Sequence, residues 1–331
     1  MKMNDQKRSL ALGARTIPSP RSISKEARAA LERLVGEDGI PVYARYDMPP
    51  PDDAAAWMRM KAAANAQYAA AMKGLAGALN STVTTIETGQ ATIHIATPET
   101  PFSQSHAIID LHGGALVFGG GEACQVGART QADRHGVRCY GVDYRMPPEH
   151  PYPAALDDCM AAYRHVLERH APADISIHGR SAGGNLAAAM LLRARDEGLP
   201  VPASLVLLSP QADLTESGDS FNTNQMIDVV LPRPLRSNNL LYAGGADLSH
   251  PYLSPLFGDL RGLPATFLQS GTRDLFLSNT VRMHRALRQA GVKTELHVFE
   301  AMPHGGFMGD TPEDRELEAE ICRFVRANWE E

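Results

Sequence analysis

The sequence contains little cysteine and no cysteine motif. Its four cysteines lie far apart, without a Cys-x-x-Cys pair or other metal-ligand spacing, at Cys124, Cys139, Cys159 and Cys322. Neither a disulfide framework nor a zinc site is therefore indicated. A chain of 331 residues can bury a core large enough to fold without such links. We expect free, buried thiols and no bound metal.

Long apolar runs and clusters of one charge are missing too. No stretch approaches eighteen apolar residues, so a membrane span is not expected. The N-terminal stretch has no apolar segment of secretory length, which favours a cytoplasmic protein. The 32 basic residues are scattered and the formal net charge is −6, so neither nucleic acid nor an anionic membrane is expected as a partner.

Repeats and low-complexity tracts are also absent, so the architecture is inferred from local patterns. The first quarter of the chain predicts helices and no strand. Residues 24–36 indicate a helix with Ser24 as its N-cap and Gly36 beyond its end. A second helix, rich in Ala and Met, is predicted over residues 52–79, after three consecutive prolines.

From about residue 83 onward, short β-branched runs alternate with helical stretches. Strands are predicted at 83–87, 91–97, 107–112, 137–144, 174–179, 204–209, 265–271 and 294–300. Helices are predicted at 122–135, 154–170, 182–197, 275–291 and 312–328. This alternation is typical of a mainly parallel sheet with helices on both faces. The first two strands have only a short connection, so we expect them to form an antiparallel edge.

One long connection interrupts the alternation. More than fifty residues, rich in polar and turn types, separate the strands predicted at 204–209 and 265–271. Connections of this length in a compact domain are usually functional. We interpret residues 211–250 as an insertion that packs with an N-terminal helical segment, 1–80, into a cap over the carboxyl ends of the strands. Residues 81–331 then form the catalytic domain.

A Gly-x-Ser-x-Gly motif lies in HGRSAGG, at residues 178–184. It follows a predicted strand and enters a predicted helix, which is the context in which Ser181 becomes an exposed nucleophile on a tight turn. The flanking glycines permit the strained backbone of that turn. A phosphate-binding glycine turn is the alternative, but the lysine or wider glycine pattern that it needs is absent.

A serine nucleophile needs a base and an acid that orients the base. Of twelve histidines, His304 is the preferred base, because it follows the last predicted strand. Asp274 follows the preceding strand and is the candidate acid, although an N-cap of the next helix is the alternative role. The chain order Ser181, Asp274, His304 is the order expected when triad members leave successive strands of such a sheet.

Backbone N–H donors for a developing oxyanion are expected in two places. The stretch Leu111-His112-Gly113-Gly114-Ala115 follows a predicted strand and approximates a glycine-rich oxyanion loop. The N–H of Ala182, directly after the serine, is the second donor. We expect the His112 side chain to hold the loop by hydrogen bonds rather than to transfer protons.

These segments together resemble the bacterial hormone-sensitive-lipase-like family of α/β-hydrolase esterases. The resemblance runs from about residue 80 to the C-terminus and includes the HGG loop, YRMPPEHPYPAALDD, the serine motif, the DLT at 213–215, RDLFLSNT and MPHG. It implies an α/β-hydrolase fold, with a mostly parallel central sheet, helices on both faces and a helical cap. It also implies hydrolysis of carboxylic esters through an acyl-enzyme, with no cofactor.

The resemblance assigns roles residue by residue. Ser181 is the nucleophile, His304 the general base and acid, and Asp274 the orienting acid. Gly113, Gly114 and Ala182 belong to the oxyanion hole, and Ala115 is a further candidate donor. A homodimer through the last strand and helix is compatible with the family.

Two residues depart from the family pattern. Ala115 replaces the third glycine of the loop, so its methyl group is expected to narrow the site or shift the loop. Arg180 stands where the family commonly has Asp or Thr. Our hypothesis is that Arg180 pairs with a carboxylate, for which Asp143, Glu149 and Asp157 are the candidates. The alternatives are an arginine that only reaches water, or one that selects acidic or oxygen-rich acyl groups.

The sequence thus predicts a serine esterase for short- to medium-chain acyl esters, with lactones as possible cyclic substrates. Activity should fall as the pH drops and His304 becomes protonated. Two other functions stay compatible with the pattern, namely a non-catalytic small-molecule receptor and an amidase or peptidase.

Overall fold

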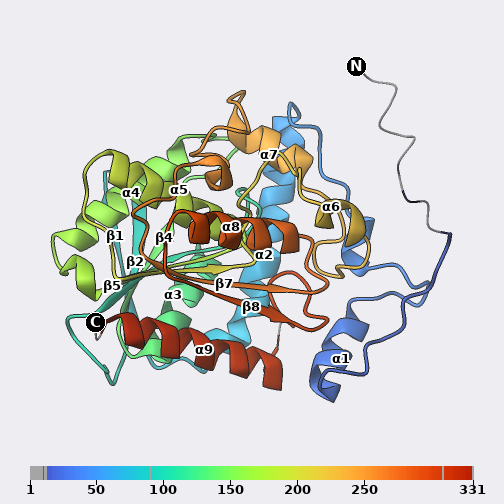
Figure 1. Ribbon diagram of the computed structural model, residues 1–331, viewed down its shortest axis with the longest axis horizontal. Helices are drawn as coiled ribbons and strands as arrows, with labels where there is room; N and C mark the ends of the chain where they lie inside the picture. Colours follow the sequence, from blue (N-terminus) through green and yellow to red (C-terminus); the bar gives the residue numbers. More distant parts are fainter. Residues whose placement is uncertain (1–9, 11–12, 90, 308, 330–331) are drawn as a thin grey trace.

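An eight-stranded sheet runs through the centre of the molecule (Figure 1). The computed structural model describes residues 10, 13–89, 91–307 and 309–329. The strands are β1 (Thr82–Thr88), β2 (Ala91–Thr97), β3 (Ala107–Leu111), β4 (Arg138–Asp143), β5 (Ile175–Arg180), β6 (Ser204–Leu208), β7 (Ala265–Gly271) and β8 (Thr294–Phe299). Their order across the sheet is β1-β2-β4-β3-β5-β6-β7-β8. Strand β2 runs antiparallel to both β1 and β4, and the remaining neighbours are parallel.

Helices cover both faces of this sheet. The covering helices are α3 (Glu122–His135), α4 (Ala154–Leu167), α5 (Ala182–Asp196), α8 (Leu277–Gln289) and α9 (Pro312–Trp329). In Figure 1, α4, α5 and α8 lie on one side of the strands, and α3 and α9 lie on the other. Buried side chains of β6 and β7 pack against α9, and those of β3 and β4 pack against α3. The predicted α/β-hydrolase architecture and the antiparallel edge are confirmed.

The strand predictions match the structure to within one residue at either end. This accuracy has a physical reason, since strands buried on both faces are continuous apolar runs that turn residues interrupt. The helix predicted over residues 24–36 is too long, because α1 (Lys25–Arg33) ends earlier. There the chain turns back, with Val35 bridged to Pro41. The predicted cap is present, since the hydroxyl of Ser24 accepts a hydrogen bond from the N–H of Ala27.

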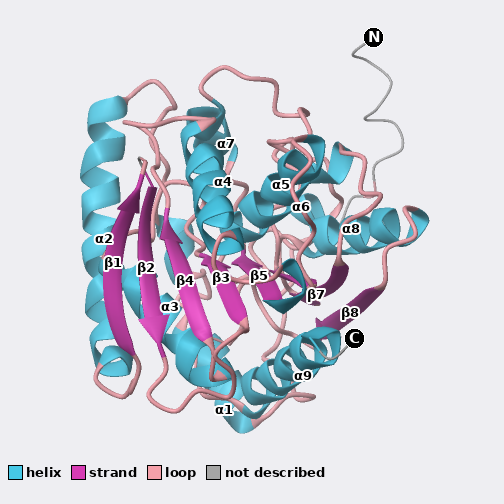
Figure 2. Ribbon diagram, turned by 90° about the vertical axis from the view of Figure 1, so that its left-hand side faces the viewer, coloured by secondary structure: helices cyan, strands magenta, loops and turns pink. Residues whose placement is uncertain are grey.

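The N-terminal helices pack against later parts of the chain. Helix α1 packs with Val229, Met302 and Phe307 in one apolar cluster. A short 3-10 turn, Val42–Arg45, leads to the long helix α2 (Ala54–Ala76), which Figure 2 shows spanning the height of the molecule. Trp57 of α2 is fully buried in a cluster with Phe118 of the loop after β3 and with Leu241.

The long connection between β6 and β7 contains short helices only. These are α6 (Ser220–Thr223), α7 (Arg236–Ala243) and the 3-10 turn Pro255–Phe257. Elsewhere in the chain, a further 3-10 turn, Pro172–Asp174, precedes β5. Figure 1 shows α6 and α7 on the same side of the sheet as α8. The connection is fixed to α8 by an ion pair, in which Arg282 Nη1 lies 2.7 Å from the buried Asp213 carboxylate. The division into a cap and a catalytic domain stays a prediction.

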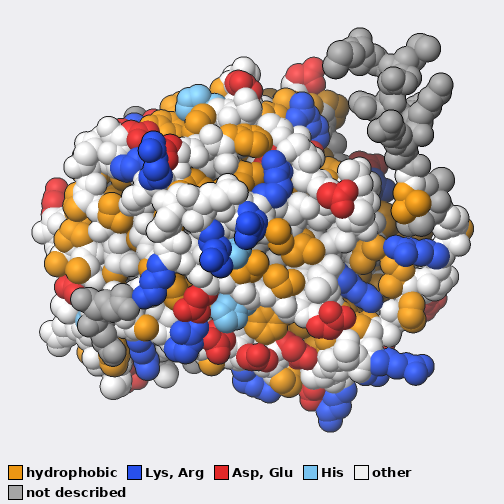
Figure 3. Space-filling view, in the orientation of Figure 1, with side chains coloured by type: hydrophobic (Ala, Val, Ile, Leu, Met, Phe, Trp, Pro, Cys, Tyr) orange, Lys and Arg blue, Asp and Glu red, His pale blue; other side chains and the backbone are white. Residues whose placement is uncertain are grey.

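The surface carries charges of both signs. On the face shown in Figure 3, basic and acidic side chains are interspersed rather than gathered in one patch. Among the residues that the structure describes, no helix combines the length and the apolar character needed to cross a membrane.

Candidate active site

Ser181 lies on a strained turn between β5 and α5. Its backbone has φ 56° and ψ −117°, a region that side-chain-bearing residues rarely adopt. The flanking glycines allow the close packing of this turn. A Cβ on Gly179 would lie 2.3 Å from the carbonyl oxygen of Gly183, and one on Gly183 would lie 1.8 Å from that of Leu111. The predicted strand-to-helix turn at Ser181 is thus present in the fold.

The structure brings Ser181, His304 and Asp274 into one hydrogen-bonded chain. The Ser181 Oγ lies 2.8 Å from His304 Nε2, and His304 Nδ1 lies 3.0 Å from Asp274 Oδ1. All three side chains are buried or nearly so. Because the carboxylate accepts from Nδ1–H, the tautomer that leaves Nε2 free to accept the serine proton is favoured.

The loops after β7 and β8 hold Asp274 and His304 in place. The Asp274 carboxylate also accepts hydrogen bonds from Ser270 Oγ at 2.7 Å and from the N–H of Phe276 at 2.8 Å. The second bond explains why α8 begins at Leu277, two residues after the predicted start. The phenyl ring of Phe276 meets the His304 ring edge-on, with centroids 4.8 Å apart.

Opposing effects set the protonation of the pair. Burial alone would lower the pKa of His304, but the nearby carboxylates, Asp274 first, outweigh burial and raise the pKa above its ordinary value. Burial would raise the pKa of Asp274, but the attraction of His304 and the hydrogen bonds keep it below its ordinary value. The pair therefore favours a charged imidazolium facing a carboxylate whenever His304 takes up a proton.

Asp228 is a second buried carboxylate at this site, and it was not among the residues selected from the sequence. Its Oδ2 accepts from the N–H of Leu275 at 2.8 Å and from the N–H of His304 at 3.2 Å. Burial, together with repulsion from Asp274, raises the pKa of Asp228 to about 6. Asp228 thus ties the connection between β6 and β7 to the loops that carry Asp274 and His304. In the sequence, the one feature that could have drawn attention to Asp228 is its position between the apolar residues Ile227 and Val229.

The glycine-rich loop after β3 lies against the serine. A Cβ on Gly113 would lie 3.4 Å from Ser181 Cβ and 3.2 Å from the carbonyl oxygen of Arg180. Within the described chain, the N–H groups of Gly113 and Gly114 donate to no other group. Ala182 is the first residue of α5, so its N–H has no partner inside that helix. These three N–H groups are the donors selected from the sequence.

His112 holds the same loop from the other end. Its Nδ1 lies 2.7 Å from the carbonyl oxygen of Gly113, and its ring stacks on Tyr144 with centroids 4.1 Å apart. The Tyr144 hydroxyl donates to the carbonyl oxygen of His112 at 2.8 Å. These contacts fit the loop-holding role expected for His112.

Ala115 adopts a backbone that favours glycine. Its φ of 53° lies in the left-handed region. The side chain packs against two apolar clusters, one around Trp57 of α2 and one around Phe221, Leu275 and Phe276. The methyl group that distinguishes this chain therefore connects the N-terminal helix with the long β6–β7 connection.

The hypothesis that Arg180 pairs with a carboxylate is wrong. Each of the three proposed carboxylates contacts another group, namely His94 for Asp143, Lys61 for Glu149 and Arg193 for Asp157. Arg180 Nη1 instead donates to the carbonyl oxygen of Gly305 at 2.6 Å. A backbone carbonyl, which no sequence pattern reveals, is the acceptor. Arg180 thereby connects the residue before Ser181 with the residue after His304.

Comparisons with known proteins identify the fold family. A family model described as the alpha/beta hydrolase fold matches residues 108–308. An acetyl-hydrolase of Streptomyces hygroscopicus is 38% identical over 199 residues, which make up 59% of this chain and 65% of that protein. The chain thus spans just under two thirds of that relative. An esterase of Acinetobacter venetianus is 33% identical over 67% of this chain and 75% of its own length.

Solved structures give the same result over more of the chain. A crystal structure of an esterase matches with a TM-score of 0.89 and 33% identity, and the match covers 96% of this chain and 98% of that one. An esterase of the bacterial hormone-sensitive lipase family matches with a TM-score of 0.78 and 28% identity, over 92% of this chain and 99% of that one. The chain belongs to the α/β-hydrolase fold family. Of these four similar proteins, three are esterases and one is an acetyl-hydrolase.

Proposed function

We propose that this protein is a serine carboxylic ester hydrolase for short- to medium-chain acyl esters, with lactones as cyclic substrates. One observation carries the proposal. The hydrogen-bonded chain from Ser181 through His304 to Asp274 joins a hydroxyl, an imidazole and a carboxylate at 2.8 and 3.0 Å. That order of groups is the arrangement that activates a serine hydroxyl for acyl transfer.

The reaction proceeds in two balanced halves. The Ser181 oxygen attacks the ester carbonyl while its proton passes to His304 Nε2, and Asp274 stabilises the imidazolium that forms. Collapse of the tetrahedral intermediate breaks the bond to the alcohol oxygen, which leaves with the proton from His304. Water then attacks the acyl-enzyme by the same route, so the acid is released and the serine regains its proton.

Backbone donors stabilise the charge that develops on the carbonyl oxygen. The N–H groups of Gly113, Gly114 and Ala182 have no acceptor elsewhere in the described chain and stand beside Ser181. Losing one such donor typically costs about 3 kcal/mol in barrier height. Fixed donors need no reorganisation as the charge forms, so they act most strongly in the transition state.

The N-terminal segment and the 211–250 insertion form a cap in this proposal. The apolar cluster of Phe221, Leu235, Leu275 and Phe276 lies next to the base, since Phe276 contacts the His304 ring. Apolar walls favour acyl groups without charge. This composition supports simple acyl esters over acidic or oxygen-rich acyl groups. Arg180, the residue considered for binding such groups, instead donates to a backbone carbonyl oxygen.

A substrate panel tests the proposal. Wild-type protein and Ser181→Ala are assayed on p-nitrophenyl esters of increasing chain length, on lactones and on p-nitroanilides. We expect turnover of short esters and loss of that turnover in the variant, with an unchanged circular dichroism spectrum. Turnover of anilides above esters would indicate an amidase, and binding without turnover would indicate a receptor. Either result would contradict the proposal.

A homodimer through β8 and α9 completes the proposal. Strand β8 ends the sheet, and Val298 on it is 42% exposed. An edge strand of this kind has free backbone groups that a second copy can pair with. Light scattering of the purified protein should give twice the mass of one chain, and a Val298→Lys variant should give the mass of one chain. A single-chain mass for wild type would contradict the dimer.

A further inference from the structure

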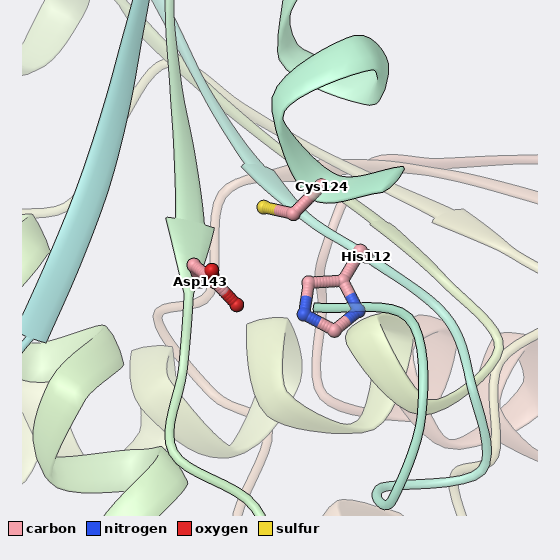
Figure 4. Close-up of side chains that lie close together, drawn as sticks. All are labelled: His112, Cys124 and Asp143. Carbon is pink, nitrogen blue, oxygen red and sulfur yellow. The ribbon is translucent and has the colours of Figure 1, made fainter. Parts of the chain in front are cut away.

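Three side chains that the proposed hydrolysis does not use converge behind the glycine-rich loop. They are His112 in that loop, Cys124 in the first turn of α3 and Asp143 at the end of β4, called the thiol cluster below (Figure 4). Their nitrogen, sulfur and oxygen atoms all lie within 4.8 Å of one another. The cluster therefore combines three different types of metal-ligand atom, supplied by three separate segments.

The His112 ring has the tautomer and the free nitrogen lone pair that a metal ligand needs. Because Nδ1 lies 2.7 Å from the carbonyl oxygen of Gly113, the ring proton is held on Nδ1 and Nε2 carries the lone pair. Nε2 is buried and has no hydrogen-bond partner in the described chain, and Figure 4 shows this edge of the ring facing Asp143. Metal-binding histidines typically have their other nitrogen fixed in this way.

The carboxylate is braced from outside the cluster. Asp143 Oδ2 accepts from the N–H of Gly121 at 2.9 Å, and His94 Nε2 lies 3.4 Å from the same oxygen. The other nitrogen of His94 lies 2.9 Å from Thr85 Oγ1, which fixes that ring as well. The hydrogen bond from Gly121 is an outer support of the kind that orients ligating carboxylates in metal sites.

The thiol is buried and adjacent to the other two groups. Cys124 is 1% exposed, and its Sγ lies within 4.8 Å of a ligand atom of His112 and of Asp143. A thiophilic cation would displace the thiol proton on binding, so that the thiolate is the ligand. Thiolate and carboxylate together would offset the charge of a divalent cation.

We propose that His112, Cys124 and Asp143 form a binding site for a thiophilic divalent cation of the zinc class. Zinc accepts nitrogen, sulfur and oxygen ligands together, whereas magnesium and calcium prefer oxygen alone. A hollow of about 450 Å³, lined by Asn65, Gly120 and Asp143 among others, reaches the carboxylate of the cluster from outside. A Cβ on Gly120 would lie 2.6 Å from Asp143 Oδ1, so the glycine keeps this approach to the carboxylate open.

Binding has a consequence for the loop. Ligand atoms of a tetrahedral zinc lie roughly 3.3–3.8 Å apart, given metal–ligand distances of about 2.0–2.3 Å. A bound zinc ion would hold the three ligand atoms at this spacing, and any movement of His112 that this requires would carry Gly113 and Gly114 with it. A displacement of about 1 Å at such donors can slow catalysis by ~100-fold. This part rests on the proposed function, and we expect zinc to lower kcat more than it changes KM.

Cobalt absorption tests the site without relying on activity. Protein treated with chelator and then freed of it is titrated with Co²⁺, and the thiolate-to-cobalt charge-transfer band in the near ultraviolet is recorded. We expect a band that saturates at one equivalent, is displaced by Zn²⁺ and persists in excess Mg²⁺. Absence of the band in wild-type protein would overturn the proposal, whether or not the protein hydrolyses esters.

Substitutions identify the residues that give rise to the thiolate-to-cobalt band. Cys124→Ala should abolish it, and the matched control Cys139→Ala, a fully buried thiol in β4 outside the cluster, should keep it. Asp143→Asn should weaken Co²⁺ binding at least tenfold, since it removes a charged ligand. Thermal melts confirm that each variant is folded before titration. A band that survives Cys124→Ala, or that is lost in Cys139→Ala, would contradict the assignment.

Discussion

Two clusters near the glycine-rich loop use similar side chains in different ways. One is the histidine–aspartate cluster of Asp228, Asp274 and His304, and the other is the thiol cluster of His112, Cys124 and Asp143. In each cluster the potential ligand atoms lie within 4.8 Å of one another. In the first, both ring nitrogens of the histidine have partners, because Nδ1 meets Asp274 and Nε2 meets Ser181. In the second, Nε2 of the histidine has none in the described chain.

This difference separates proton transfer from ligand binding. A histidine with a hydroxyl on one nitrogen and a carboxylate on the other has its lone pair aimed at a transferable proton. A histidine with a backbone carbonyl on one nitrogen and nothing on the other presents its lone pair to an incoming cation. Residue type alone therefore does not decide between the two chemistries; the partners of each ring nitrogen do. The predictions that follow test this contrast in order of expected effect.

The largest effect is expected from Asp274→Asn. The amide offers His304 Nδ1 a donor or a weaker acceptor, so the ring loses the tautomer that accepts the serine proton. We expect kcat for a p-nitrophenyl ester to fall by about 10⁴-fold. Asp247→Asn, on an exposed aspartate of the connection between β6 and β7, is the matched control and should keep wild-type kcat. A loss below tenfold in Asp274→Asn would mean that this carboxylate does not orient the base.

Asp228→Asn is expected to act on stability and on the pH profile. An amide in place of the carboxylate sets an N–H₂ group against the N–H donors of Leu275 and His304. Leaving one buried donor unpaired typically costs about 1–3 kcal/mol, which urea unfolding would measure.

The direction of the pH shift in Asp228→Asn follows from the negative charge that the substitution removes. The Asp228 carboxylate helps to raise the pKa of His304, so its removal should move the acid limb of kcat/KM to lower pH. An acid limb that stays in place would show that Asp228 only supports the fold.

Arg180→Met is expected to produce the opposite pH shift. The arginine charge lowers the pKa of His304, so its loss should move the acid limb of kcat/KM to higher pH. Losing the hydrogen bond to the carbonyl oxygen of Gly305 should also loosen the histidine loop, with about a 5- to 10-fold drop in kcat. The control is Arg261→Met, because that arginine is exposed and paired only with the nearby Asp259. A shift in the same direction as Asp228→Asn would refute the electrostatic account.

Much of the fold could be predicted from the sequence because its signals are local. The strands are apolar runs bounded by turn residues, so their limits could be predicted to within one residue. Ser181, Asp274 and His304 could be selected because each follows a predicted strand, and parallel strands end at the same edge of a sheet.

The remaining features depend on long-range placement. Arg180 meets a carbonyl oxygen 125 positions away, and Asp228 meets an N–H 76 positions away. Backbone groups have no residue-specific signature, so neither contact could be predicted from residue type. The thiol cluster was missed for a similar reason, since its ligands are separated along the chain and follow no metal-binding spacing.

Covalent labelling of the serine tests the central claim most directly. Diethyl p-nitrophenyl phosphate is incubated with the protein, and loss of activity on a p-nitrophenyl ester is compared with peptide masses after proteolysis. The account predicts one diethylphosphoryl group per chain, on the peptide that contains Ser181, in proportion to the activity lost. Ser181→Ala should take up no label. Labelling at another residue, or ester turnover that survives while Ser181 is fully labelled, would contradict the account.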